Sequence, residues 1–476
     1  MRTKILMAVV ATLLAVSWTG AEEIAGLPLH SEILGDGAIR VWLGDHASTT
    51  TVMAFATEKG IVVVDTFGVP EIDAQLREVI ARELGRSDFA FLINTHEHRD
   101  HTGGNSAYDD CTIVGHELIA GGLVKTAGLR DFQLQWYPGH IAEMEEELQG
   151  LEPGDPKVAA LRENLIYNRL FFKALKENQD LLPPTLTFSD RMTLDLGDTT
   201  FELSYIGGMH TASDTAIFVP EHHLLLTGDL MADVWLTDAP GCLGSFLVRD
   251  RMPHDFPRFL ANWDRLLAQK DQIETLMPAH WNGELSYDGA KARVEYVRTL
   301  WDGILVATKE NKNIEYVLSE YTLAAHFPDL AESPGFSEQG NFSSIAELWR
   351  EVSGQASAAR TLYRLLEEGA DAASIAEVLA EHNVESPDYF FLESELNAYG
   401  YIFLQRDMVD EAVKMFEINV GLFPESWNVY DSLGEALLRA GDTDKAVAMY
   451  QKSLFLNPEN TSGQEVLLRI QGAEKT

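Results

Sequence analysis

The spacing of apolar and polar residues divides the chain into a strand-rich part and helical parts. Between about residues 38 and 285, short apolar runs rich in β-branched residues are separated by turn residues, as in the strands of a packed sheet. Residues 70–84 instead place their apolar side chains on one helical face, with Pro70 at the start and Gly85 after the last turn. Alternating strands and helices, with polar residues directly after apolar strands, predict a layered α/β domain whose chemistry lies at strand ends.

Two further stretches have the spacing of apolar residues that is typical of helices. Residues 116–178, rich in Glu and Leu, interrupt the strand-rich part, so we expect a helical insert that could cover a site. Within it, Trp136, Tyr137 and His140 either line a substrate pocket or form the core of the insert. After about Tyr287 the strand pattern stops, and the rest of the chain is predicted to be all-α.

A repeat is present near the C-terminus. Six positions recur after 34 residues: Leu396, Tyr399, Gly400, Ala412, Phe416 and Pro424 correspond to Tyr430, Leu433, Gly434, Ala446, Tyr450 and Pro458. The period and the residue types resemble two tetratricopeptide repeats, in which small residues let paired helices approach closely. An ordinary pair of helical hairpins is the alternative. Tetratricopeptide-like repeats would favour contacts with another protein or self-association.

The first 21 residues have the order of a signal peptide. Arg2 and Lys4 precede a short apolar run at 5–16, and Ala21 is a small residue before a cleavage point at Glu22. We therefore expect a periplasmic or secreted chain without a membrane span after signal cleavage, with an uncleaved anchor as the alternative. The predicted organisation is a signal peptide at 1–21, a strand-rich α/β domain at 22–300, a helical linker region at 301–390 and repeats at 391–463.

Charge and cysteine content narrow the classes of partner and of fold. The chain has 74 Asp and Glu against 36 Lys and Arg, a net charge of −38, which disfavours nucleic acid as a partner. Cys111 and Cys242 are the two cysteines. They could pair after export, but two cysteines cannot form a disulfide scaffold. A small-molecule substrate is the expected partner.

The segment from Thr95 to Gly104 concentrates metal-binding chemistry. It reads Thr-His-Glu-His-Arg-Asp-His-Thr-Gly-Gly and directly follows an apolar strand. In a loop, His96 and His98 can turn toward one point while Asp100 and His101 face a second. Zinc binds imidazole nitrogen and carboxylate oxygen, so the segment predicts the nucleus of two metal sites. Iron or manganese could bind the same donor set.

This segment resembles the HxHxDH signature of the metallo-β-lactamase superfamily, and four further motifs of that family follow the expected order. They are Asp65 after a buried strand, His210 in Gly-Gly-Met-His-Thr, Asp229 in Leu-Thr-Gly-Asp and His280 in Met-Pro-Ala-His. The resemblance implies an αββα sandwich over about residues 38–285, followed here by the all-α region with tetratricopeptide-like repeats. It also implies two Zn²⁺ ions: one on His96, His98 and His210, the other on Asp100, His101 and His280, with Asp229 reaching both. Asp65 would orient the metal loop.

The same resemblance implies a metal-dependent hydrolase in which a hydroxide bridging the two metals attacks an ester, lactone, thioester or lactam bond. Asp100 would also act as a catalytic residue by taking or returning a proton. Two alternatives remain. One is a mononuclear iron oxidoreductase of the same fold, similar to persulfide dioxygenases, and the other is a binding scaffold based on the C-terminal repeats.

Overall fold

The computed structural model describes residues 22–35, 37–46, 49–128, 130–177, 181–231, 255–280, 285–331, 336–384 and 387–473. The predicted signal peptide and Cys242 lie outside these residues. Cys111 is buried and forms no disulfide with another described residue. Among the helices in the described ranges, none is long and apolar enough to cross a membrane.

The first sheet has eight strands that follow one another in sequence order. Neighbouring strands are antiparallel as far as the fifth strand and parallel from there to the eighth. The strands are β1 (Glu23–Ile24), β2 (Leu27–Ile33), β3 (Ala38–Leu43), β4 (Val52–Thr57), β5 (Gly60–Val64), β6 (Phe89–Ile93), β7 (Thr112–His116) and β8 (Leu186–Phe188). The strand pattern had suggested a start at residue 38, so β1 and β2 extend the sheet beyond the prediction.

The second sheet has five strands in the order β13-β12-β11-β10-β9, with one parallel pair, β12 and β13. Its strands are β9 (Arg191–Asp195), β10 (Thr200–Tyr205), β11 (Thr215–Val219), β12 (Leu224–Gly228) and β13 (Thr275–Pro278). The two sheets pack face to face, because Val62 and Val64 of the first share a buried core with Ile217 and Leu226 of the second.

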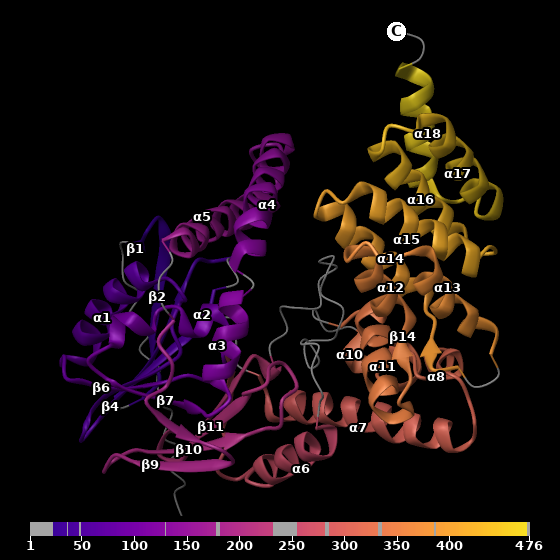
Figure 1. Cartoon of the computed structure of the whole chain (residues 1–476). Helices are drawn as coiled ribbons and strands as arrows, with labels where there is room; N and C mark the ends of the chain where they lie inside the picture. The colour runs from indigo at the N-terminus through magenta and orange to yellow at the C-terminus, as the bar shows by residue number, and fades with distance from the viewer. Residues whose placement is uncertain are drawn as a thin grey trace, which may run out of the picture.

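Helices cover the outer faces of both sheets, so the domain has the layers α, β, β, α (Figure 1). In β5, Ile61 and Val63 point away from the sheet interface toward helix α1 (Pro70–Leu84), as the period of two along a strand requires. On the other sheet, Phe218 and Leu225 pack against α6 (Phe256–Leu267) and α7 (Tyr287–Lys309). The predicted sandwich is therefore present.

The predicted insert consists of three helices between β7 and β8: α3 (Ile119–Gly128), α4 (Arg130–Gly150) and α5 (Lys157–Lys176). The second and third pack against each other and project from the sandwich as an antiparallel pair (Figure 1). Between them, Pro153 to Pro156 breaks the helical pattern. Tyr137 packs on Phe171 and Phe172, so this residue belongs to the core of the insert.

The C-terminal region is a stack of helices that rises from α7 toward the C-terminus (Figure 1). Its remaining helices are α8 (Ile314–Glu320), α9 (Leu323–His326), α10 (Pro328–Ala331), α11 (Glu338–Ser353), α12 (Ala358–Glu367), α13 (Ala372–Ala380), α14 (Glu393–Gln405), α15 (Val409–Leu422), α16 (Trp427–Arg439), α17 (Thr443–Leu456) and α18 (Thr461–Ala473). A small parallel pair of strands, β14 (Ala356–Ser357) and β15 (Tyr389–Phe390), corrects the prediction that strands stop after residue 287.

The residue pairs on which the repeat prediction rests are in contact. A Cβ atom added to Gly400 would lie 2.4 Å from the Phe416 ring, and one added to Gly434 would lie 2.9 Å from the Tyr450 ring. Each glycine thus lets a helix approach the aromatic residue of its neighbour at equivalent positions 34 residues apart. The assignment of these hairpins to the tetratricopeptide family stays a prediction.

Candidate metal centre

All the histidines and aspartates of the five motifs lie just beyond the ends of strands. Asp65 follows β5, and the segment that begins at His96 follows β6 and includes the one-turn helix α2 (Arg99–Thr102). His210 lies in the loop after β10, Asp229 directly follows β12, and His280 comes two residues after β13. The two packed sheets bring these loops together at one edge of the sandwich, so residues as far apart in the chain as Asp100 and His280, 180 positions, become neighbours.

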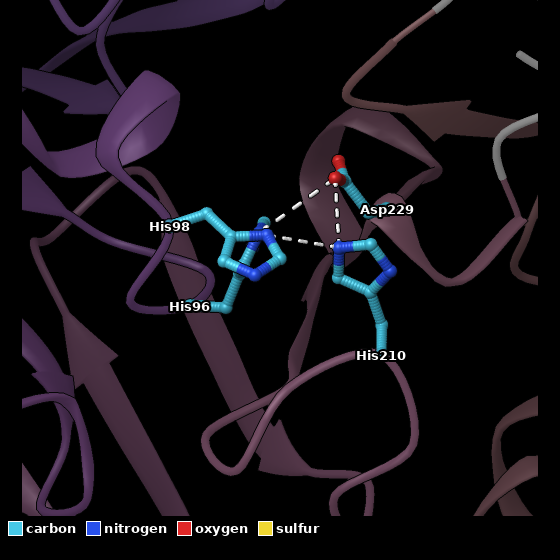
Figure 2. Close-up of side chains that lie close together, drawn as sticks. All are labelled: His96, His98, His210 and Asp229. Atoms are coloured by element: carbon cyan, nitrogen blue, oxygen red, sulfur yellow. Dashed lines mark hydrogen bonds and ion pairs between the residues drawn. The ribbon is translucent and has the colours of Figure 1, made fainter. Parts of the chain in front are cut away.

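The first group consists of His96, His98, His210 and Asp229, whose donor atoms all lie within 4.8 Å of one another (Figure 2). Asp229 Oδ2 is 3.1 Å from His210 Nε2 and 3.7 Å from His96 Nε2. His210 Nε2 is also 3.1 Å from His98 Nδ1. In Figure 2 the three rings and the carboxylate point toward a common centre.

The second group consists of Asp100, His101 and His280. His280 Nε2 is 3.1 Å from Asp100 Oδ2 and 3.2 Å from His101 Nε2. The other oxygen of Asp229 faces this group, with Oδ1 at 3.3 Å from His101 Nε2 and 3.5 Å from His280 Nε2. One carboxylate therefore presents one oxygen to each group, as a ligand shared by two ions would.

The donor atoms of these groups fit a divalent metal. His96 Nε2 and both oxygens of Asp229 are buried without a hydrogen-bond partner among the described residues. Buried polar atoms are normally satisfied, so unsatisfied donors that converge on one point indicate an ion. Imidazole nitrogen and carboxylate oxygen are the donors that zinc, iron and manganese accept. The seven residues could hold two ions.

Burial and charge favour the metal-binding protonation states of His96 and Asp229. Burial and the neighbouring imidazoles hold the pKa of His96 well below its ordinary value, which leaves a neutral ring with a free lone pair. Burial opposes ionisation of Asp229, but the surrounding histidines outweigh it and keep the pKa of Asp229 well below its usual range. A neutral imidazole beside an ionised carboxylate is the state that binds a divalent ion.

Asp65 orients the metal loop through hydrogen bonds to Thr95 and His101, as the family resemblance implied. Its Oδ1 accepts a hydrogen bond from the backbone N–H of Thr95 at 2.8 Å, and its Oδ2 accepts one from the Thr95 hydroxyl at 2.7 Å. The same Oδ2 is 3.0 Å from His101 Nδ1, while the Thr95 hydroxyl is 3.0 Å from His96 Nδ1. Asp65 and Thr95 thus orient one histidine of each group so that its Nε2 faces inward.

Two supporting carboxylates were not found by reasoning from the sequence. Asp214 accepts hydrogen bonds from the backbone N–H groups of Met209 and His210, at 2.8 and 2.7 Å, and so closes the loop that carries His210. Glu97 accepts hydrogen bonds from the hydroxyl of Ser213 and, at 3.3 Å, from the N–H of Ala212, which joins the metal loop to the His210 loop. The only signal in the sequence was acidic residues close to the motif histidines.

Asp100 is, with His98, one of two partly exposed residues among the candidate ligands. Its side chain is 25% exposed, whereas the side chains of His280, His101 and Asp229 are at most 1% exposed. Asp100 is therefore the carboxylate of the centre that a substrate can reach. The negative charge of Asp100 also affects two tyrosines of the insert. Burial is the main cause that raises the pKa of Tyr137 and of Tyr167, and the charge of Asp100 is the second.

The comparisons with known proteins concern both the strand-rich domain and the whole chain. The family model described as the metallo-beta-lactamase superfamily matches residues 43–280, which is half of the chain and includes every residue of both groups. The chain belongs to the metallo-beta-lactamase superfamily. The resemblance inferred from the five motifs is thereby confirmed.

Two curated relatives come from Nocardioides sp. (strain JS1661). The alpha subunit of 2,4-dinitroanisole O-demethylase is 25% identical over 193 residues, 40% of this chain and 43% of that protein. The beta subunit is 27% identical over 92 residues, 19% of this chain and 29% of that protein. The chain thus spans less than half the length of the curated relatives it matches.

A solved structure, the stereoselective inverting sec-alkylsulfatase Pisa1 from Pseudomonas sp., shares the fold of this superfamily member. It aligns with 91% of this chain and 66% of its own, with 12% sequence identity and a TM-score of 0.50. The alignment extends beyond the residues of the family match, so it includes much of the helical region.

Proposed function

We propose that the protein is an exported hydrolase with two divalent metal ions, zinc in the first place, that cleaves a carboxylic ester, lactone, thioester or lactam bond. The observation that carries this proposal is the placement of Asp229, whose two oxygens face two separate groups of donors 3.1 to 3.7 Å away. A site for one ion would need no carboxylate aimed in both directions. Export is proposed on the N-terminal sequence alone.

The residues of this chain would hold the ions and handle protons. His96, His98 and His210 would bind one ion, and Asp100, His101 and His280 the other. When bound, such ions would supply Lewis acidity to the bond that breaks and lower the pKa of a metal-bound water molecule. Asp100, the partly exposed carboxylate of the centre, is placed to accept the proton that this water would lose and to return it to the leaving group.

The alternative of a mononuclear iron oxidoreductase is less well supported. Three donors suffice for a single catalytic ion, whereas the structure brings seven donors together in two groups. The relatives add two classes of substrate to those proposed, because one is named an O-demethylase and another a sec-alkylsulfatase. Sulfate esters and aryl methyl ethers therefore belong in any test of activity.

The test is a substrate panel assayed with the zinc-loaded full chain. The panel contains a lactam, a lactone, an aryl ester, a thioester, a sulfate ester and an aryl methyl ether. His98→Ala should abolish turnover and bind fewer ions, while His326→Ala, at an exposed position of α9, should change neither. Two metal ions per chain and loss of turnover in His98→Ala support the proposal. One iron per chain with oxygen consumption on a persulfide contradicts it.

A further inference from the structure

Arg99 is a buried cation in the middle of the metal loop. It lies between His98 and Asp100 at the start of α2, and the residue is only 6% exposed. Its side chain extends under the helical insert, where the guanidinium carbon is 5.9 Å from the centre of the Phe171 ring. None of the roles proposed above uses this side chain.

The guanidinium of Arg99 lacks the partners that its burial calls for. Nε and Nη2 are buried and have no hydrogen-bond partner among the described residues, and no carboxylate there forms an ion pair with it. Arg360, another largely buried arginine, is paired with Glu347. A buried guanidinium without a counter-charge is strongly unfavourable, and a protein with a net charge of −38 has many carboxylates that could have supplied one.

Arg99 is close to the metal centre but does not belong to it. Tyr137 of α4 lies within electrostatic reach of both Arg99 and Asp100, since both charges contribute to the shift of its pKa. Because Arg99 is not among the seven donor residues, it suits a group at the far end of a substrate rather than the bond that is cut.

We propose that Arg99 binds a carboxylate or a similar oxyanion carried by the substrate, in a subsite between α2 and the insert helices α4 and α5. The inference rests on the proposed hydrolase function and narrows its substrates to anionic ones. The planar guanidinium fork matches a carboxylate or sulfonate with two parallel hydrogen bonds. Tyr137 packs on the buried Phe171 ring but stays partly exposed, so its ring can offer apolar surface to the carbon skeleton beside that anion.

A binding experiment tests this subsite independently of turnover. Benzoate, benzenesulfonate and the neutral benzamide are titrated calorimetrically into the full chain, with zinc and without it. Wild type should bind both anions at least about 10-fold more tightly than benzamide, and Arg99→Gln should lose this preference. Arg169→Gln, which removes an exposed arginine paired with Glu145 on the same insert, should keep it. The preference must persist without zinc, because an anion held only by metal would lose it.

A kinetic experiment links the subsite to substrate choice. Hydrolysis of 4-carboxyphenyl acetate is compared with that of 4-carbamoylphenyl acetate. Arg99→Gln should lower the ratio of their kcat/KM values about 10- to 100-fold, mainly through KM. Arg99→Lys keeps the charge without the fork, so it should retain part of the preference and serves if the glutamine variant folds poorly.

The outcomes separate the two proposals. If neither of these esters nor any member of the substrate panel is cleaved, but benzoate binding still requires Arg99, the hydrolase proposal fails and the anion subsite stands. Two results would show that Arg99 merely packs against Phe171. In one, the Arg99→Gln protein retains the preference for anions. In the other, its only change is a lower melting temperature that is the same with and without benzoate.

Discussion

Asp73 holds a proton that should make the stability of the domain depend on pH. It lies in the first turn of α1 and is completely buried. Its Oδ1 accepts a hydrogen bond from the N–H of Phe67 at 2.8 Å, whereas its Oδ2 is buried without a partner among the described residues. A Cβ atom added to Gly104, at the end of the metal-loop segment, would meet Oδ2 at 1.9 Å. The carboxyl group is therefore enclosed by protein.

Burial raises the pKa of Asp73 from 3.8 to about 7, although its backbone hydrogen bonds oppose the shift. Between these two values the folded protein keeps a proton that the unfolded chain has released. The folded state therefore loses stability as pH rises: the contribution is fully present below 3.8 and is gone above about 7. The difference corresponds to about 4 kcal/mol of unfolding free energy.

Asp73→Asn removes the titration while leaving an amide oxygen for the N–H of Phe67. We expect urea unfolding, followed by tryptophan fluorescence of the metal-free chain, to show wild type losing about 4 kcal/mol more than the variant between pH 4 and pH 8. Asp109→Asn, at an exposed position, is the matched control and should follow wild type. Parallel curves for wild type and Asp73→Asn would refute the reasoning, because they would show that Asp73 is ionised in the folded state.

Three further predictions concern the metal centre and the helical stack. Asp229→Asn should reduce zinc bound per chain, measured by elemental analysis, and lower activity by more than about 100-fold; two retained ions would argue against the shared ligand. Thr95→Val should weaken zinc binding about 10-fold in a competition assay with a chelator, since it removes the hydroxyl behind the metal loop; unchanged affinity would mean that this hydroxyl has no orienting role. Gly434→Ala should lower the free energy of thermal unfolding by about 1–3 kcal/mol, because the added methyl group meets the Tyr450 ring. The control Gly421→Ala has open space around the added methyl group, so it should be neutral or stabilising. Equal effects of the two glycine substitutions would contradict the close approach.

The features that the sequence revealed are those encoded locally. The period of two in β5 and the one-sided apolar pattern of α1 are fixed by neighbouring residues, so both elements could be predicted within a few positions. The seven candidate ligands were found because each stands in a short motif after an apolar strand. Their division into two groups followed from the resemblance, and the structure brings them together in that division.

The features that the sequence concealed depend on contacts distant in the chain. β2 is half-exposed, with a weak alternation of apolar residues, and it forms through pairing with β3. Glu97 looked like an ordinary acidic residue within the motif, because nothing local shows that Ser213, 116 residues later, donates to it. Arg99 likewise gave no sign that the insert would cover it. Only the folded chain shows which charges lack partners.

The outer face of the second sheet shares one hydrophobic core with the C-terminal helices. Leu225 and Leu276 of that sheet belong to the same buried cluster as Trp349 of α11 and Phe390 of β15. The strand-rich and helical regions are therefore not independent modules. A deletion or a domain exchange that cuts the chain near residue 300 would leave a water-exposed apolar face, and the truncated domain would be prone to aggregate. Over evolutionary time, substitutions on either side of this core are expected to change together, so the helical region should be inherited with its metal domain rather than shuffled among other partners.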